Sequence, residues 1–566
     1  MEFAAVATHA TVFCNGKEVG QHLGGWTPFA CDLTDALQWD TPAANVLDVR
    51  VDEKVGHNTQ GFLPIIQPHF GGIWQSVGLR IATGAILDPI GWFAFGKADG
   101  ALQCRLPIVP GPGTPADHVD VVVLDGATAI AQGSLPVADG SAQGTLQVQS
   151  PRLWSPSAPN RYRVATRLLA ADGTELDRIE RPVVFRSLQA DGTTIRWNGA
   201  PLSVRGILHW GFSPPDFAPS MDPARWRRDL EHFRSLGFNT LKCCLFVPPP
   251  FVYDLCAELG MLVWQEYPTW HPQMDAAHQD ELLREYREFF LLDGRHGAVA
   301  FRSLTCETGH SAELPVIEAV FAACHAAVPD TLVVDDSSWI GWQRVTDFWD
   351  EHPYGNHRWW PGRLAEFRQH SVTKGKKPLL LGECIAADTW ADSSTFALGA
   401  DAPARWWQPL CQADQVRAEA WIRDQFGAAT LASLAPIAKD YALRARRYQI
   451  ERLRLSIPDA GYVVSVARDF PKARMGLLDD QGNPKWQAAD WAWHGDSMLC
   501  LDTERDARSF VVGSQGQPIH ARLARGGLPP SPPHLLETLQ PVAAPTPVTV
   551  RGAVRSEEHT SELQSH

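Results

Sequence analysis

Two carboxylates follow apolar, strand-like runs, and their placement suggests acid–base or nucleophilic chemistry. Glu307 comes shortly after the run 299–304, and Glu383 comes directly after 378–382. A carboxylate at the end of a buried strand costs desolvation energy unless the protein uses it. Two facing carboxylates can cleave a glycosidic bond, because one protonates the leaving oxygen while the other attacks the anomeric carbon. One of the two, kept protonated by its surroundings, would then be the acid, and the other would be the nucleophile.

The same pattern leaves other chemistries open. Carboxylates at strand ends also bind metals or act as bases in unrelated enzymes. Glu266 ends a strand as well, and we interpret it as a structural carboxylate, because a retaining glycosidase needs only two. A metal enzyme built on Glu266 and Glu307 would need nearby histidine ligands, and the sequence shows no such set. We therefore predict no metal and no organic cofactor.

The elements that must position these groups alternate between apolar strands and amphipathic helices from about residue 195. Asp222 can cap a helix that carries Trp226, Leu230 and Phe233 on one face. Such alternation predicts a parallel sheet covered by helices. Eight strands over about 300 residues favour a (β/α)₈ barrel, whose reactive groups lie at the carboxyl ends of the strands. The strand candidates are 203–205, 238–245, 261–264, 299–304, 331–334, 348–350, 378–381 and 462–466.

Short strand-like runs with turn signals occupy the rest of the chain. Asn15-Gly16 predicts a hairpin, because both residues tolerate positive φ. The strand spacing before the barrel fits small all-β domains, including a sandwich. The last residues resemble the translation of a sequencing adapter, and we exclude them from the fold. The predicted segments are β domains at 1–83 and 84–187, the barrel at 188–500, an incomplete β-rich domain at 501–554, and the excluded stretch 555–566.

Composition argues against several classes of function. Lys and Arg number 50 against 64 Asp and Glu, and the net charge of −14 disfavours a nucleic-acid or anionic-membrane surface. No apolar run approaches the ~20 residues that span a bilayer. The 11 cysteines lack zinc-ligand spacing and are interpreted as reduced, mostly buried thiols. No signal peptide is visible and we expect the natural start to be missing, so the compartment stays open.

Several motifs stand in a fixed order along the chain. They include Gly71-Gly-Ile-Trp-Gln-Ser-Val77, Ser303-Leu-Thr-Cys-Glu-Thr-Gly-His310 and Pro378-Leu-Leu-Leu-Gly-Glu383, with further stretches at 12–29, 198–206, 253–266 and 461–479. Together they resemble glycoside hydrolase family 2, the group that contains β-galactosidases, β-glucuronidases and β-mannosidases. The resemblance covers most of residues 1–500. It implies a jelly-roll sugar-binding domain at 1–83, an immunoglobulin-like sandwich at 84–187 and a catalytic barrel after them.

The resemblance also implies roles for individual residues. Glu307 and Glu383 would be the acid/base and the nucleophile of a retaining, exo-acting β-glycosidase. His209 follows the first barrel strand, where the family often has a sugar-contacting histidine. His352 and Tyr354 follow the sixth, where a tyrosine commonly touches the nucleophile. For each histidine, a satisfied structural role is an equally open interpretation.

Three departures from the family pattern bear on activity. Cys306 stands where an asparagine usually bonds the sugar 2-hydroxyl, and a thiol is a weak donor. Lys242 replaces the usual arginine and supplies charge without a planar fork. Ala473 and Met475 stand where glucuronidases carry Asn-x-Lys, which favours a β-galactosidase-like substrate over a glucuronate.

Two functions therefore stay open. The first is a glycosidase with a carbohydrate substrate, with His209, Lys242, Cys306, His352 and Tyr354 as the substrate-binding candidates. The second, motivated by Cys306 and Lys242, is a catalytically impaired carbohydrate-binding protein on the same scaffold. The sequence leaves a homo-oligomer open in either case.

Overall fold

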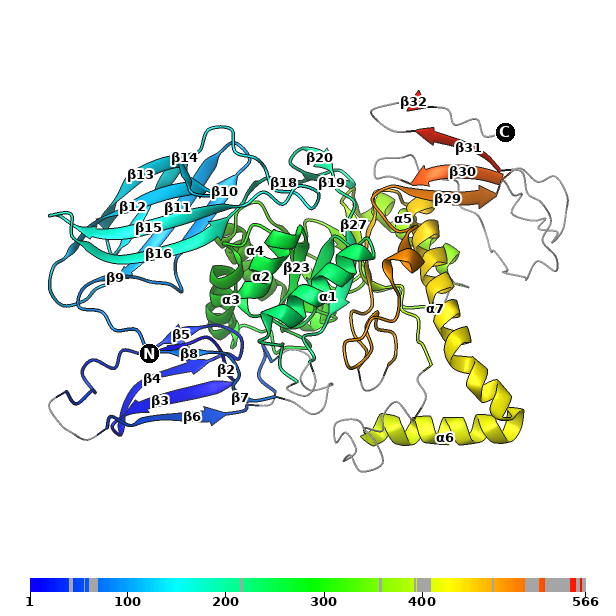
Figure 1. Cartoon of the computed structure of the whole chain (residues 1–566), viewed down its shortest axis with the longest axis horizontal. Helices are drawn as coiled ribbons and strands as arrows, with labels where there is room; N and C mark the ends of the chain where they lie inside the picture. The colour runs from blue at the N-terminus through cyan, green and yellow to red at the C-terminus, as the bar shows by residue number, and fades with distance from the viewer. Residues whose placement is uncertain are drawn as a thin grey trace.

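The computed structural model describes a central barrel with β-rich regions at both ends and a projecting helical arm, formed by residues 409–426 and the first part of 428–456 (Figure 1). Within the described part, no helix is long and apolar enough to cross a membrane. The structure describes all residues except 40–43, 55, 61–69, 214–216, 356–358, 391–392, 394–408, 471–472, 504–518, 525–549, 556–559 and 562–566.

The barrel is an eight-stranded sheet in the order β25-β24-β23-β22-β21-β28-β27-β26, which confirms the barrel that the sequence predicts. All its strand pairs are parallel. Near the gap between the two edge strands, the amide of Asp347 donates to the carbonyl of Val333 at 2.8 Å, so the ring is nearly closed. The strands are β21 (Arg205–His209), β22 (Thr240–Cys243), β23 (Leu262–Glu266), β24 (Val299–Cys306), β25 (Leu332–Ser337), β26 (Trp349–Asp350), β27 (Leu379–Cys384) and β28 (Gly461–Val464).

The first strand is displaced from its predicted place. The sequence predicts a strand at 203–205, whereas β21 runs from Arg205 to His209. The Asn239 side chain accepts from the Arg205 amide and donates to the Ser203 carbonyl, both at 2.8 Å. Hydrogen bonds from the Asn239 side chain therefore replace strand pairing before Arg205, and the strand begins at Arg205.

Amphipathic helices cover the outside of the barrel, as predicted. In the first of them the Asp222 side chain accepts from the Ala224 amide at 2.9 Å, and Trp226, Leu230 and Phe233 are buried. An N-cap of this kind satisfies a donor that the helix itself cannot pair. The helices around the barrel are α1 (Pro223–Ser235), α2 (Pro250–Leu259), α3 (Gln279–Asp293), α4 (Leu314–Ala327) and α5 (Trp360–Lys374).

Small antiparallel sheets form the N-terminal region. The predicted hairpin is confirmed: Asn15 and Gly16 have φ of 52° and 79° and join β3 to β4. Its strands pair in the order β4-β3-β6, beside the sheets β5-β1-β8 and β2-β7. The jelly-roll assignment of this region stays a prediction. The strands are β1 (Glu2–Phe3), β2 (Val6–Ala7), β3 (His9–Cys14), β4 (Lys17–Leu23), β5 (Phe29–Ala30), β6 (Leu47–Asp52), β7 (Gly72–Ile73) and β8 (Val77–Gly78).

The second β region folds one long sheet over a shared core. Its main path is β16-β15-β12-β13-β14-β11-β10-β17, with β9 paired to β11, and side chains from both halves of this path form one apolar cluster. The sequence does not predict β13, because most of its side chains are exposed and it contains Gly133 and Pro136, which disfavour strands. The strands are β9 (Ile86–Leu87), β10 (Phe93–Lys97), β11 (Ala101–Val109), β12 (Ala116–Asp125), β13 (Thr128–Ala138), β14 (Ser141–Gln147), β15 (Tyr162–Ala170), β16 (Glu175–Val183) and β17 (Phe185–Arg186).

Three further pieces complete the chain. A small sheet of β18 (Leu188–Asp191), β19 (Thr194–Trp197) and β20 (Ala200–Pro201) leads into the barrel. The helix α6 (Pro409–Phe426) and the first part of α7 (Ala428–Ser456) extend away from the barrel (Figure 1). The second half of α7 packs on the barrel, with Ala442, Ile450 and Leu453 buried in its core. The last sheet contains β29 (Met498–Thr503), β30 (Ile519–Ala524), β31 (Val550–Arg555) and β32 (Thr560–Ser561). The predicted domain boundaries, including the excluded stretch 555–566, stay predictions.

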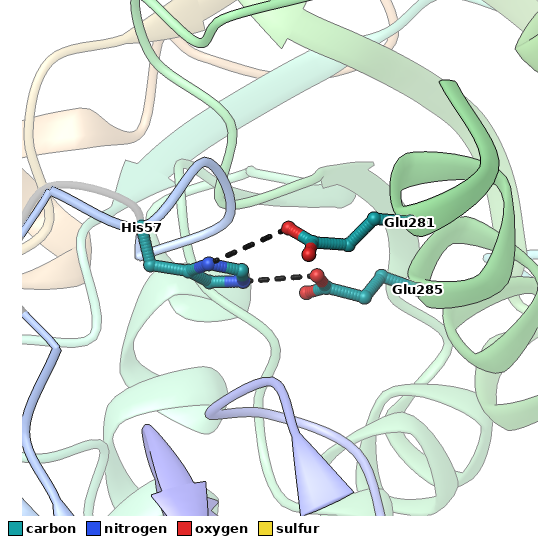
Figure 2. Close-up of side chains that lie close together, drawn as sticks. All are labelled: His57, Glu281 and Glu285. Carbon is teal, nitrogen blue, oxygen red and sulfur yellow. Dashed lines mark hydrogen bonds and ion pairs between the residues drawn. The ribbon is translucent and has the colours of Figure 1, made fainter. Parts of the chain in front are cut away.

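A buried histidine attaches the N-terminal region to the barrel. His57 Nε2 lies 2.9 Å from Glu285 Oε1 on α3, and its Nδ1 lies 3.9 Å from Glu281 Oε1, one helical turn away (Figure 2). The second oxygen of Glu285 accepts from the Thr59 hydroxyl. The side chains of His57 and Glu285 are 3% and 2% exposed, whereas that of Glu281 is 39% exposed. Glu285 therefore makes the stronger of the two contacts.

Replacing Glu285 by Gln should lower the free energy of unfolding by about 2–3 kcal/mol, because the amide keeps only one acceptor oxygen and removes the charge that strengthens the hydrogen bonds with His57 and Thr59. Glu281→Gln is the matched control, since it lies on the same helix, faces the same imidazole and is partly solvated. It should cost less than about 1 kcal/mol. Urea unfolding of both variants measures the difference. Equal losses would show that the interface does not depend on the Glu285 contact.

Candidate active site

The two predicted catalytic carboxylates lie at the carboxyl ends of β24 and β27. Glu307 follows β24 with a positive φ of 46°, and its amide donates to the carbonyl of Ser337 at 3.0 Å. The turn is fixed by Asp336, whose carboxylate accepts from the amides of Thr308 and Gly309 at 2.9 and 3.0 Å. Glu383 lies within β27 and is 7% exposed. Rigid strand ends therefore hold both groups at one mouth of the barrel.

A histidine lies between the two carboxylates. His352 Nδ1 is 2.9 Å from Glu307 Oε1 and 3.8 Å from Glu383 Oε2, and its side chain is fully buried. An oxygen of Glu307 and an oxygen of Glu383 lie within 4.8 Å of each other. The geometry therefore joins three predicted site residues into one cluster.

The charge state of Glu307 differs from the one that the sequence predicts. Burial would raise the pKa of the Glu307 carboxyl, but the hydrogen bond and the charge of His352 lower it below its ordinary value. Burial would likewise lower the pKa of His352, yet Glu383, Glu307 and Asp350 together raise it to about 9. The sequence-based expectation that the surroundings keep Glu307 protonated is wrong for the free site, because a positively charged neighbour stabilises the carboxylate.

Glu383 is held by a phenol and a thiol. The Tyr354 hydroxyl donates to Glu383 Oε2 at 2.6 Å and lies 3.2 Å from Ser465 Oγ. The thiol of Cys244 donates to Glu383 Oε1 at 3.3 Å. Burial of the Tyr354 hydroxyl and the charge of Glu383 raise the pKa of this phenol well above its ordinary value, although 43% of the residue is exposed. Tyr354 therefore remains a neutral donor that orients the carboxylate while part of its ring faces solvent.

Lys242 is a buried cation beneath the carboxylates. Its Nζ lies 2.8 Å from Glu266 Oε2 and 3.9 Å from Glu383 Oε1, and the side chains of Lys242 and Glu266 are 0% exposed. The ammonium also donates to Ser337 Oγ at 2.9 Å and lies over the Trp264 ring. Burial would lower the pKa of Lys242, but the charges of Glu266 and Glu383 hold it well above its ordinary value. Glu266 therefore supplies the counter-charge of Lys242 and is closed off from solvent.

Two thiols stand beside the carboxylate pair. Cys306 is 3% exposed and interacts with Cys244, which contacts Glu383. Burial, above all, raises the pKa of both thiols well above the ordinary value, so both are protonated at neutral pH. Neither forms a disulfide. The side of the site at Cys306 therefore offers weak donors in place of an amide.

His209 packs among aromatic side chains. Its ring packs against Trp226 and Phe246, with ring centroids 4.7 and 5.8 Å away, and its Nδ1 accepts from the Gly211 amide at 2.8 Å. Burial lowers the pKa of His209 to about 3, so the ring is neutral. These contacts fit the structural interpretation better than a sugar contact, which stays a prediction.

Several residues of the cluster were not predicted. Ser337 Oγ donates to Asp350 Oδ2 at 2.6 Å and lies 3.1 Å from His352 Nε2. Asp350 also accepts from the Gly382 amide at 2.7 Å, and burial raises its pKa to about 6. Trp339 lies close by, with its ring centroid 6.2 Å from that of His352. Ser337 and Asp350 lie at the ends of β25 and β26, and this strand-end position is the feature of the sequence that could have identified them as site residues.

The chemistry of the cluster makes it a poor metal site. Ligand atoms of Glu307, His352 and Glu383 lie within 4.8 Å of one another, as do those of Cys244, Glu266 and Glu383. A histidine ligand must be neutral, whereas the carboxylates around His352 favour its protonated form. In the second set, a cation is already present, because the ammonium of Lys242 lies 2.8 Å from Glu266 and 3.9 Å from Glu383.

The chain is similar to glycoside hydrolases, both by a family model and by curated relatives. The family model "Glycosyl hydrolases family 2" matches residues 115–186. A putative β-glucuronidase of Formosa agariphila is 26% identical over 328 residues, 56% of this chain and 30% of the relative. A β-galactosidase of Thermoanaerobacter pseudethanolicus is 24% identical over 313 residues, 53% of this chain and 41% of the relative. The matched region is thus well under half the length of either relative.

Solved structures share the fold over a larger part of the chain. A family 2 β-galacturonidase from Eisenbergiella tayi, bound to galacturonate, has a TM-score of 0.65 at 20% identity and covers 87% of this chain and 86% of that one. A β-glucuronidase from Parabacteroides merdae has a TM-score of 0.67 at 16% identity, covering 88% of this chain and 65% of that one. At these identities the likeness concerns the fold.

Proposed function

We propose that this chain, a relative of the family 2 glycosyl hydrolases, is a retaining β-glycosidase that removes terminal β-linked sugars. Glu383 would attack the anomeric carbon and form a glycosyl-enzyme. Glu307 would protonate the leaving oxygen and then deprotonate the water that releases the sugar. Both steps use only groups present in the cluster.

The observation that carries the proposal is the closeness of the two carboxylates. Their nearest oxygens lie within 4.8 Å of each other. Retaining glycosidases place the carboxyl groups about 5–5.5 Å apart, whereas inverting enzymes need about 6.5–9.5 Å to admit a water molecule. The spacing therefore favours attack by Glu383 itself over attack by water.

A β-galactosidase-like specificity is the finer part of the proposal. A glucuronidase recognises the sugar carboxylate with the amide of an Asn and the ammonium of a Lys. Ala473 and Met475 stand at these two positions and supply neither group, and the predicted preference for a galactoside rests on this difference. Curated relatives include both β-galactosidases and β-glucuronidases, so relatedness alone does not decide between the two sugars.

A panel of aryl β-glycosides tests the function: galactoside, glucoside, mannoside, glucuronide and N-acetylglucosaminide. We expect hydrolysis of one of them, the galactoside first among them, and its loss in Glu383→Gln. Binding of a sugar by folded protein without hydrolysis of any substrate would support the impaired carbohydrate-binding protein instead. In that case Cys306→Asn, which restores the amide usual in the family, should recover turnover.

A further inference from the structure

We propose that His352 is a positioning residue that stores the proton which Glu307 delivers to the glycosidic oxygen. The proposal rests on the proposed function, because it concerns the acid step of that same site. Its basis is geometric: the buried imidazole places Nδ1 2.9 Å from Glu307 Oε1 and 3.8 Å from Glu383 Oε2. A hydrogen bond of this length provides a direct path for one proton.

The other ring nitrogen has a partner that fixes its role. Ser337 Oγ donates its hydrogen to Asp350 and accepts from the Lys242 ammonium. It can therefore only accept from His352 Nε2, which lies 3.1 Å away and must carry a hydrogen. With Nε2 protonated, the remaining proton of the pair lies either on Nδ1 or on Glu307. An ion pair and a neutral pair thus differ only in the position of that proton.

The surrounding charges favour the ion pair. Carboxylates of Glu307, Glu383 and Asp350 face the imidazole from the ends of β24, β27 and β26, while Lys242 on β22 opposes them. Together they raise the pKa of His352 to about 9. The resting site therefore holds the proton on His352, and Glu307 is the carboxylate of the ion pair.

Glycosylation changes this balance at the moment the proton is needed. The Glu383 oxygen bonds to the anomeric carbon, and the bond to the leaving oxygen breaks with its electron pair on that oxygen. Glu307 takes the proton from His352 Nδ1 and passes it to the leaving oxygen. As Glu383 becomes a neutral ester, the imidazolium loses a carboxylate 3.8 Å away and holds its proton less tightly.

Hydrolysis of the glycosyl-enzyme runs the transfer backwards. Water attacks the anomeric carbon, its proton passes through Glu307 to His352, and Glu383 leaves as a carboxylate. The returning negative charge again favours a protonated imidazole. Protons and charge balance over the cycle without any further reactant.

His352→Asn tests the proposal, because an amide can still donate to Glu307 but carries no titrating proton. We expect kcat/KM to fall about 100-fold for a phenyl glycoside, whose leaving group needs a proton. For a 2,4-dinitrophenyl glycoside, which leaves unaided, the loss should stay within about threefold. The basic limb of the kcat/KM profile should move from near pH 9 to lower pH by more than one unit. Equal losses for both substrates with an unmoved limb would overturn the proposal.

A titration that needs no turnover separates this inference from the proposed function. NMR of the imidazole Cε1–H, assigned by its absence in His352→Asn, should give a midpoint near pH 9 in the wild type. Glu383→Gln should lower the midpoint, whereas Glu288→Gln, on α3 beside His22, should leave it unchanged. A wild-type midpoint at or below 6.5, the ordinary value, would overturn the proton store. A midpoint near 9 in a protein that hydrolyses no glycoside would support the pair but reject the function.

Discussion

Glu383→Ala should reduce hydrolysis of an aryl β-glycoside on the order of 10⁵-fold, because the residue that forms the covalent intermediate is lost. The carboxylate accepts from Tyr354 and Cys244 and has the cation of Lys242 3.9 Å away. These contacts orient the carboxylate through both of its oxygens. Added azide should restore turnover of a dinitrophenyl glycoside and give the α-glycosyl azide, since it enters the space that the side chain vacates.

Glu307→Ala is the matched variant, and its pattern should differ. A dinitrophenyl glycoside should still form the glycosyl-enzyme, because that leaving group needs no acid, and hydrolysis of the intermediate should become the slow step. Azide should then give the β-glycosyl azide. The same anomer from both variants, or rescue of neither, would contradict the assigned roles. Product configuration by NMR distinguishes these outcomes.

Lys242→Met should lower the free energy of unfolding by about 3–5 kcal/mol, because it leaves the fully buried Glu266 without its counter-charge. The variant also removes a donor from Ser337 and the cation near Glu383. Catalysis should therefore fall together with stability. Chemical denaturation at neutral pH measures the loss.

The double variant Lys242→Met/Glu266→Gln isolates the pair. Removing both charges should recover most of the lost stability, since the cost comes from an unpaired buried carboxylate more than from a missing bond. Activity should stay low, because the cation beside Glu383 is still absent. If the double variant were less stable than Lys242→Met alone, Glu266 would have a partner other than Lys242.

The barrel was predictable because its strands are buried on both faces and read as continuous apolar runs. The hairpin at Asn15-Gly16 and the cap at Asp222 were predictable because each depends on local backbone chemistry. The start of β21 was not, since it depends on Asn239, a residue distant in sequence. Strand β13 was missed because tertiary pairing overrides its weak propensity.

The site shows the same division between local and distant causes. Strand-end position singled out Glu307 and Glu383, because the carboxyl ends of parallel strands meet at one face. Tyr354 came from the family resemblance. The charge of Glu307 could not be predicted, since it depends on which side chain comes within hydrogen-bonding distance across the barrel. The sequence could not show that His352 would be this neighbour.

Trapping the covalent intermediate tests the central claim most directly. The reagent is a 2-deoxy-2-fluoro-β-galactosyl fluoride, or the analogue of whichever sugar proves to be the substrate. It forms a glycosyl-enzyme with a retaining enzyme, and this ester hydrolyses slowly. Peptide mass spectrometry should then find one fluoroglycosyl group on Glu383 and none on Glu307 or Glu266. A label on either of those carboxylates, or no label on protein that turns over the parent glycoside, would contradict the account.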